Sequence, residues 1–137
     1  MPALEQLRGM RVVADPPALD AARWSGDRTE TGAPVGDVTV LRFSPDEAFA
    51  IGARHVDIDD DDAIIVDEDG FVGAWCDLAD LWPHLEWSAP DSGPALAQGS
   101  IAGVPAKLWV PDDEDYALLL TAAAYAHELS DRLGWQS

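Results

Sequence analysis

The amino-acid sequence predicts an α+β domain in which hairpins form an antiparallel sheet and helices pack on one face. From residue 37 onward, an apolar run, an acidic turn and a second apolar run recur three times. Residues 121–135 then carry the pattern of an amphipathic helix. A chain of 137 residues, 47% of them hydrophobic, is long enough for one core and too short for two.

The first 36 residues are predicted to be a loosely ordered N-terminal arm that contains one short helix. We expect this helix in DPPALDAARW, because Asp15 can act as its N-cap and proline is tolerated in the first turn. The stretch 25–37 lacks apolar periodicity and is typical of an exposed loop. Residues 37–137 are expected to form the single α+β domain.

The three repeats are interpreted as hairpins closed by carboxylate-rich turns. Their sequences are VTVLRF-SPDE-AFAIGA, AIIV-DEDG-FVGAW and AKLWV-PDDED-YALLL. The apolar runs are short and rich in β-branched and aromatic residues, which favours strands, and Pro45 and Gly70 occupy turn positions. As an alternative, residues 44–56 can form a helix with Ser44 as N-cap. The strand is preferred because Gly52 weakens a helix there.

Two helices are expected after the second hairpin. In DLADLWPHLEW, Asp77 can cap a short helix that Pro83 ends near Trp82. The C-terminal helix is predicted to begin with Thr121 as N-cap and to stop at Gly134. One face of that helix collects Ala122, Tyr125, Ala126, Leu129 and Leu133, and Glu128 pairs with Arg132 on the other.

The charge balance is strongly acidic, with 26 acidic against 8 basic residues and a formal net charge of -18. Such a surface repels phosphates and anionic lipids, so nucleic acids and membranes are not expected as partners. Three explanations remain open: a high-salt host, a basic partner (nucleic-acid mimicry included), or metal binding. The first is preferred because the acids are spread along the chain and salt would screen their repulsion.

A soluble, cytoplasmic protein is expected. Cys76 is the one cysteine in the sequence, which fits a reducing compartment. The N-terminus has no basic segment followed by an apolar run, as a secretory signal would. No stretch approaches the roughly 18 apolar residues of a membrane span.

The segment DIDDDDAIIVDEDG, residues 57–70, resembles a calcium-binding EF-hand loop. Its candidate metal ligands are Asp57, Asp59, Asp61 and Glu68. An EF-hand needs glycine at loop position 6, where Asp62 stands, and a helix afterwards, where a turn is indicated instead. These four residues are therefore a weak candidate, and a solvated acidic connection is the preferred interpretation.

No catalytic or cofactor-binding residue is identified. The histidines are scattered, and Ser100 directly follows a glycine instead of standing between two, as a nucleophile elbow requires. The six tryptophans are the remaining anomaly. Core packing explains most of them, but tryptophan is also enriched in protein interfaces. The interface candidates are Trp75, Trp82, Trp87 and Trp109.

Two stretches, LRFSPDEAFAIG and GSIAGVPAKLWVPDDEDYALLLTAAAYAHELSDRL, resemble the small gamma subunit of heterotetrameric sarcosine oxidase. The resemblance extends over about residues 38–133. It implies a fold related to the folate-binding T-protein of glycine cleavage. In such complexes the larger subunits carry the FAD and the folate, and no catalytic residue is known in the gamma chain.

The resemblance therefore implies a non-catalytic accessory subunit of a flavin-dependent amine oxidase that acts on N-methylated amino acids or related amines. Flavoprotein subunits would be its partners, it would bind no cofactor itself, and it would not be catalytic alone. The alternative is a stand-alone acidic binding protein, either a cation binder or an inhibitor that mimics nucleic acid.

Overall fold

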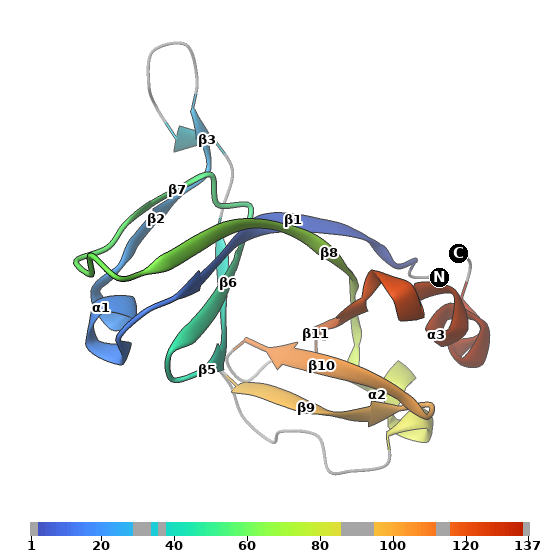
Figure 1. Ribbon diagram of the computed structural model, residues 1–137. Coiled ribbons are helices and arrows are strands. Elements are labelled where there is room, and N and C mark those ends of the chain that lie inside the picture. The colour runs from blue at the N-terminus through green and yellow to red at the C-terminus, as the bar shows by residue number, and fades with distance from the viewer. Residues whose placement is uncertain (1–2, 29–33, 36–37, 86–94, 112–115, 136–137) are drawn as a thin grey trace. The chain divides into compact units, whose positions relative to one another are not determined.

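The computed structural model describes residues 3–28, 34–35, 38–85, 95–111 and 116–135 (Figure 1). The chain divides into two compact units. Residues 7–69 form the N-terminal unit, and residues 1–6 with 70–137 form the C-terminal unit. This division differs from the expected one, which separated residues 1–36 from residues 37–137. Among the described residues, no helix combines the length and apolar character needed to cross a bilayer.

Most elements of the N-terminal unit are strands. In chain order they are β1 (Glu5–Val13), α1 (Pro16–Ala21), β2 (Arg23–Ser25), β3 (Asp27–Arg28), β4 (Pro34–Val35), β5 (Thr39–Ser44), β6 (Glu47–Ile51), β7 (His55–Asp57) and β8 (Ile64–Asp77). The hydrogen-bonded order is β5-β6-β1-β8, while β2 pairs with β7 and β3 with β4. The helix α1 follows Asp15 as N-cap, which confirms the short helix predicted there.

The C-terminal unit contains the second half of β8 and all later elements. These are α2 (Leu78–Leu81), η1 (Trp82–His84), β9 (Ala95–Ile101), β10 (Val104–Val110), β11 (Tyr116–Ala122), η2 (Ala123–Tyr125) and α3 (Ala126–Leu133). The strand order is β8-β11-β10-β9, with antiparallel pairing between β11 and both neighbours and between β10 and β9. An antiparallel sheet and a C-terminal helix are thus confirmed.

Two of the three predicted hairpins are confirmed. Strand β5 pairs antiparallel with β6, so the helical alternative for residues 44–56 is wrong. Strand β10 pairs antiparallel with β11, and the turn residues 112–115 lie outside the described residues. The expected hairpin around DEDG is wrong, because residues 67–70 continue β8 without a turn.

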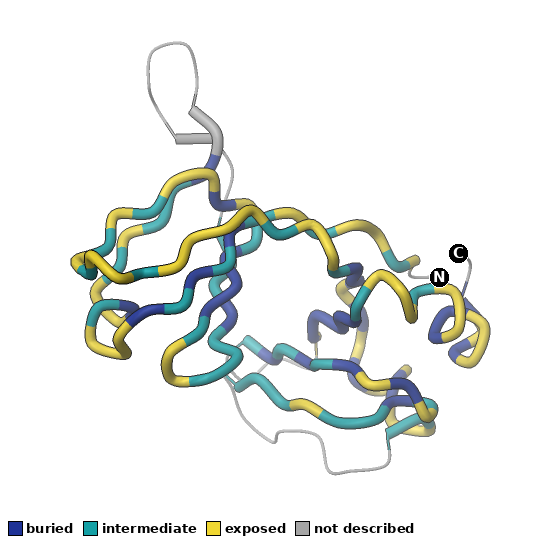
Figure 2. The backbone as a smooth tube through the Cα atoms, in the orientation of Figure 1, coloured by how far each residue is buried: buried dark blue, intermediate teal, exposed yellow. Residues whose placement is uncertain are grey.

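The continuation of β8 has a physical cause in its pairing with β1. The two strands are neighbours in the sheet, and Arg11 of β1 donates to the Glu68 carboxylate at 3.1 Å. Strand pairing and this ion pair override the local turn preference of Asp69 and Gly70. Figure 2 shows the first half of β8 largely exposed, whereas residues 72–74 are buried.

Strand β1 corrects the prediction of a loosely ordered arm. Its residues pair with β6 in register, from Gly9 opposite Ile51 to Val13 opposite Glu47. Met10 and Val12 are buried, while Arg11 reaches Glu47 at 2.8 Å and lies over the Phe43 ring. This alternation of buried and outward side chains is typical of a strand with one face against a core.

The C-terminal helix is shorter than predicted. Thr121 is not its N-cap: the residue belongs to β11, and its buried hydroxyl donates to the Pro105 carbonyl at 2.7 Å. The 3-10 turn η2 intervenes before α3. The predicted stop at Gly134 is confirmed by its left-handed φ of 73°, and the Glu128–Arg132 pair is also present.

A hairpin between β9 and β10 was not predicted. Its two turn residues, Ala102 and Gly103, both have positive φ (52° and 80°), as in a type I′ turn. Arg132 of α3 donates to the Ala102 carbonyl at 2.8 Å and so fixes the turn to the helix. The sequence Ile-Ala-Gly-Val conceals this turn because alanine rarely adopts a left-handed conformation.

Candidate functional site

The predicted interface tryptophans lie at different levels of exposure. Trp75 on β8 is 39% exposed and Trp82 in η1 is 61% exposed. Trp109 on β10 is half-buried, and Trp87 lies outside the described residues. Trp75 and Trp82 therefore offer accessible aromatic surface in the C-terminal unit.

Trp75 forms a stacked pair with Tyr116 of β11. Their ring centroids are 5.6 Å apart and the ring planes differ by 7°. The register explains the contact: Trp75 lies opposite Leu118 and Tyr116 opposite Asp77, so the two side chains are diagonal neighbours on one sheet face. Tyr116 is 43% exposed, so the pair presents a continuous aromatic surface.

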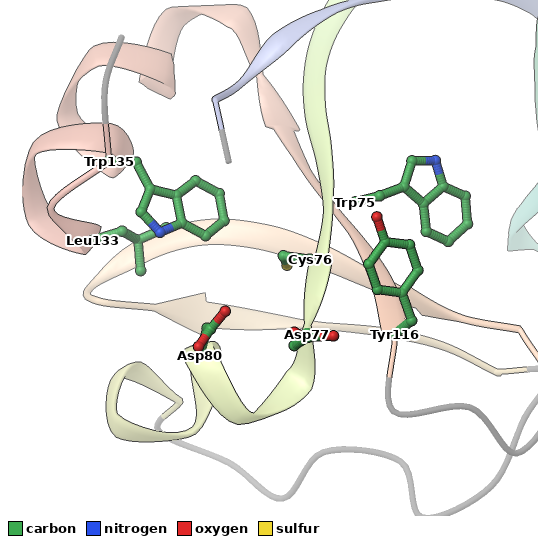
Figure 3. A pocket seen from close by; sticks show the side chains of 7 residues that line it. All are labelled: Trp75, Cys76, Asp77, Asp80, Tyr116, Leu133 and Trp135. Carbon is green, nitrogen blue, oxygen red and sulfur yellow. The ribbon is translucent and has the colours of Figure 1, made fainter. Parts of the chain in front are cut away.

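A cavity of about 500 Å³ borders this aromatic pair (Figure 3). In Figure 3, Trp135 and Leu133 lie on one side of β8, and Trp75 and Tyr116 lie on the other. The remaining lining residues are Cys76, Asp77 and Asp80. The cavity thus combines aromatic walls with two carboxylates, which suits a partner that is both apolar and cationic.

The thiol of Cys76 is the one ordinary nucleophile among the lining side chains. Burial, with a smaller contribution from the carboxylates of Asp80 and Asp77, raises the pKa of Cys76 to about 12. The thiol is therefore protonated at neutral pH, whereas the thiolate is the reactive form. The chemistry of the cavity favours binding over thiolate catalysis.

The raised pKa of Cys76 makes stability depend on alkaline pH. An unfolded chain loses the thiol proton near pH 9, but the folded chain keeps it up to about pH 12. Stabilisation is complete below pH 9 and is lost as pH rises through this window, by at most about 4 kcal/mol. Urea unfolding between pH 9 and pH 12 should show a smaller decrease in the free energy of unfolding for Cys76→Ala than for the natural chain. Equal decreases in both proteins would contradict the raised pKa of Cys76.

The candidate metal ligands are not brought together. Asp57 ends β7, Asp59 and Asp61 lie in the following connection, and Glu68 in β8 pairs with Arg11. Within the part of the chain that the structure describes, no three His, Cys, Asp or Glu side chains are grouped closely enough to hold a metal ion. Asp60, between the candidates, instead accepts from the backbone N–H groups of Asp15 and Asp62.

Sequence reasoning found Trp75 but missed the other cavity residues. Tyr116 in β11, Asp80 in α2 and Trp135 after α3 come from separate parts of the chain, and only the strand register and the helix positions bring them to one cavity. An indication for Tyr116 existed in its place at the start of an aliphatic run, directly after an acidic turn.

A scan of protein-family models and a search of curated proteins found no match to this sequence. In the C-terminal unit, the side chains form an exposed aromatic pair next to a cavity with a protonated thiol and two carboxylates.

Proposed function

We propose that this chain is a non-catalytic accessory subunit of a flavin-dependent amine oxidase complex and stabilises its larger catalytic subunits. The observation that carries the proposal is the exposed, stacked pair of Trp75 and Tyr116. The resemblance of residues 38–133 to the gamma subunit of sarcosine oxidase supplies the class of partner. FAD and folate would belong to those partners.

Physical chemistry supports the aromatic pair as a protein-binding surface. Large aromatic side chains supply much of the binding energy of interfaces, because each buries about 150–250 Å². Stacking already restricts the two rings before a partner arrives, which lowers the entropy lost on binding. The carboxylates of Asp77 and Asp80, which line the same cavity, favour basic side chains on the partner.

The proposal is tested by purifying the tagged chain from its native host. We expect flavin-containing subunits to co-purify in a fixed ratio. The isolated chain should be colourless and should not oxidise N-methylated amines, whereas the complex should. Purification of the chain as a stable monomer without a flavoprotein would contradict the proposed function.

A further inference from the structure

A second surface feature is a groove of about 570 Å³ in the N-terminal unit. Three segments that are distant in the sequence form it: residues 13–16 from the end of β1 to the start of α1, residues 45–46 in the turn between β5 and β6, and residues 60–64 leading into the start of β8. None of these residues takes part in the aromatic pair or in its cavity.

Hydrogen bonds hold the three segments of the groove together. The Ala14 N–H donates to the Asp46 carbonyl at 3.0 Å, and the Asp15 N–H donates to the Asp60 carboxylate at 2.9 Å. Arg42 donates from one nitrogen to the Pro16 carbonyl at 3.3 Å and to the Pro45 carbonyl at 2.8 Å. The groove is therefore preformed, and a ligand need not order it on binding.

The walls of the groove are largely apolar. Ala14 belongs to a buried core cluster, and Pro16 and Pro45 expose their rings at the surface. Ile64 is 60% exposed, although covering an isoleucine side chain is worth about 1.5–3 kcal/mol. An apolar side chain from another molecule would cover Ile64 and fill the space beside it.

Carboxylates surround these apolar walls. They belong to Asp15, Asp46, Asp60 and Asp62. The N–H groups of Asp15 and Asp62 lower the pKa of Asp60, so this carboxylate is charged at neutral pH. Arg42 neutralises little of this negative charge, because its Nη1 atom pairs with the Asp20 carboxylate at 2.8 Å.

The charge pattern decides what occupies the groove. A second copy of the chain is disfavoured, because two molecules of net charge -18 repel each other. We propose that the groove binds a segment of a partner protein that presents an apolar side chain next to arginine or lysine. The apolar side chain packs on Ile64, and the cation lies between the carboxylates. The inference rests on the proposed accessory function, since it describes the partner subunit.

The experiment measures fluorescence anisotropy of a labelled synthetic peptide of alternating leucine and arginine with the full-length chain. At about 0.15 M salt, distant charges are screened and only the groove should contribute strongly. We expect saturable binding that Ile64→Ser weakens by about tenfold, because the leucine loses its apolar contact. Asp62→Asn should weaken binding by about threefold.

Matched variants separate the groove from the general acidity of the chain. Ile65 is 44% exposed but points to the opposite face of β8, so Ile65→Ser should change the affinity by less than about twofold. Asp59 does not line the groove, so Asp59→Asn should behave in the same way.

Several results would overturn the inference. One is the absence of saturable peptide binding. Another is an equal affinity for a peptide with serine in place of leucine. A third is an equal loss of affinity in Ile64→Ser and Ile65→Ser. Competition by N-acetyl-arginine amide as strong as by the peptide would indicate a small cationic ligand instead. The measurement needs no flavoprotein, so it tests the groove separately from the accessory function. If a flavoprotein co-purifies with the chain but the peptide does not bind, only the proposal for the groove is overturned.

Discussion

Replacing Trp75 with alanine is expected to weaken binding of the proposed flavoprotein partner by about thirtyfold or more, the loss typical of an interface hot spot. The change removes the larger ring of the stacked pair and leaves Tyr116 without its neighbour. Because the side chain is already 39% exposed in the free chain, stability should change far less than partner affinity. Trp75→Phe keeps an aromatic face and should lose less affinity than Trp75→Ala.

The measurement is a titration of the purified flavoprotein subunits with variant chains, alongside urea unfolding of each variant. Tyr125→Ala is the matched control, because Tyr125 is 40% exposed in the same unit but does not line the cavity. Its partner affinity should stay within about twofold of the natural chain. Comparable losses in Trp75→Ala and Tyr125→Ala would show that the aromatic pair is not the binding surface.

The elements that follow from local chemistry were predictable. The short runs of β-branched and aromatic residues gave β5, β6, β10 and β11, because each run is bounded by turn residues. Gly134 stops α3 because a left-handed residue is needed at that place and glycine adopts this conformation at little cost. Such signals lie within a few residues of the feature that they determine.

The elements that depend on distant partners were not predictable. The sequence DEDG has the composition of a turn, but Arg11, far away in the chain, pairs with Glu68 and holds it in a strand. Likewise, β1 is stabilised as a strand by pairing with β6 and β8. The residues of β1 alone do not indicate which strands it pairs with. Thr121 has the side chain of an N-cap, yet its hydroxyl bonds to Pro105 on a neighbouring strand.

The acidic connection shows why residue type alone was a poor guide to the site. Asp60 forms an Asx turn by accepting the N–H of Asp62, and it also fixes the start of α1 through the N–H of Asp15. A carboxylate in a metal-like pattern thus serves the backbone. The groove that it helps to build uses three separate segments, which no local sequence pattern connects.

Gly9 is expected to be the most sensitive glycine in the N-terminal unit, because β1 and β6 approach each other closely there. A Cβ atom at this position would lie 2.0 Å from the carbonyl oxygen of Ala50 and 2.9 Å from the Cα of Ile51. Both obstacles are backbone atoms, so no side-chain rotation relieves the clash. The strand pair must separate, although β1 has neighbours on both sides in the sheet.

We therefore expect Gly9→Ala to lower the free energy of unfolding by about 3 kcal/mol or more, a large part of the roughly 5–15 kcal/mol of a typical domain. Gly134→Ala is the control: its φ is 73°, but nothing lies within 4 Å of the added Cβ. Only the backbone strain, about 1–2 kcal/mol, should appear there. Urea unfolding of both variants decides the matter. If Gly9→Ala lost no more stability than Gly134→Ala, the close approach of β1 and β6 could not be rigid, because the strands would have moved apart at little cost.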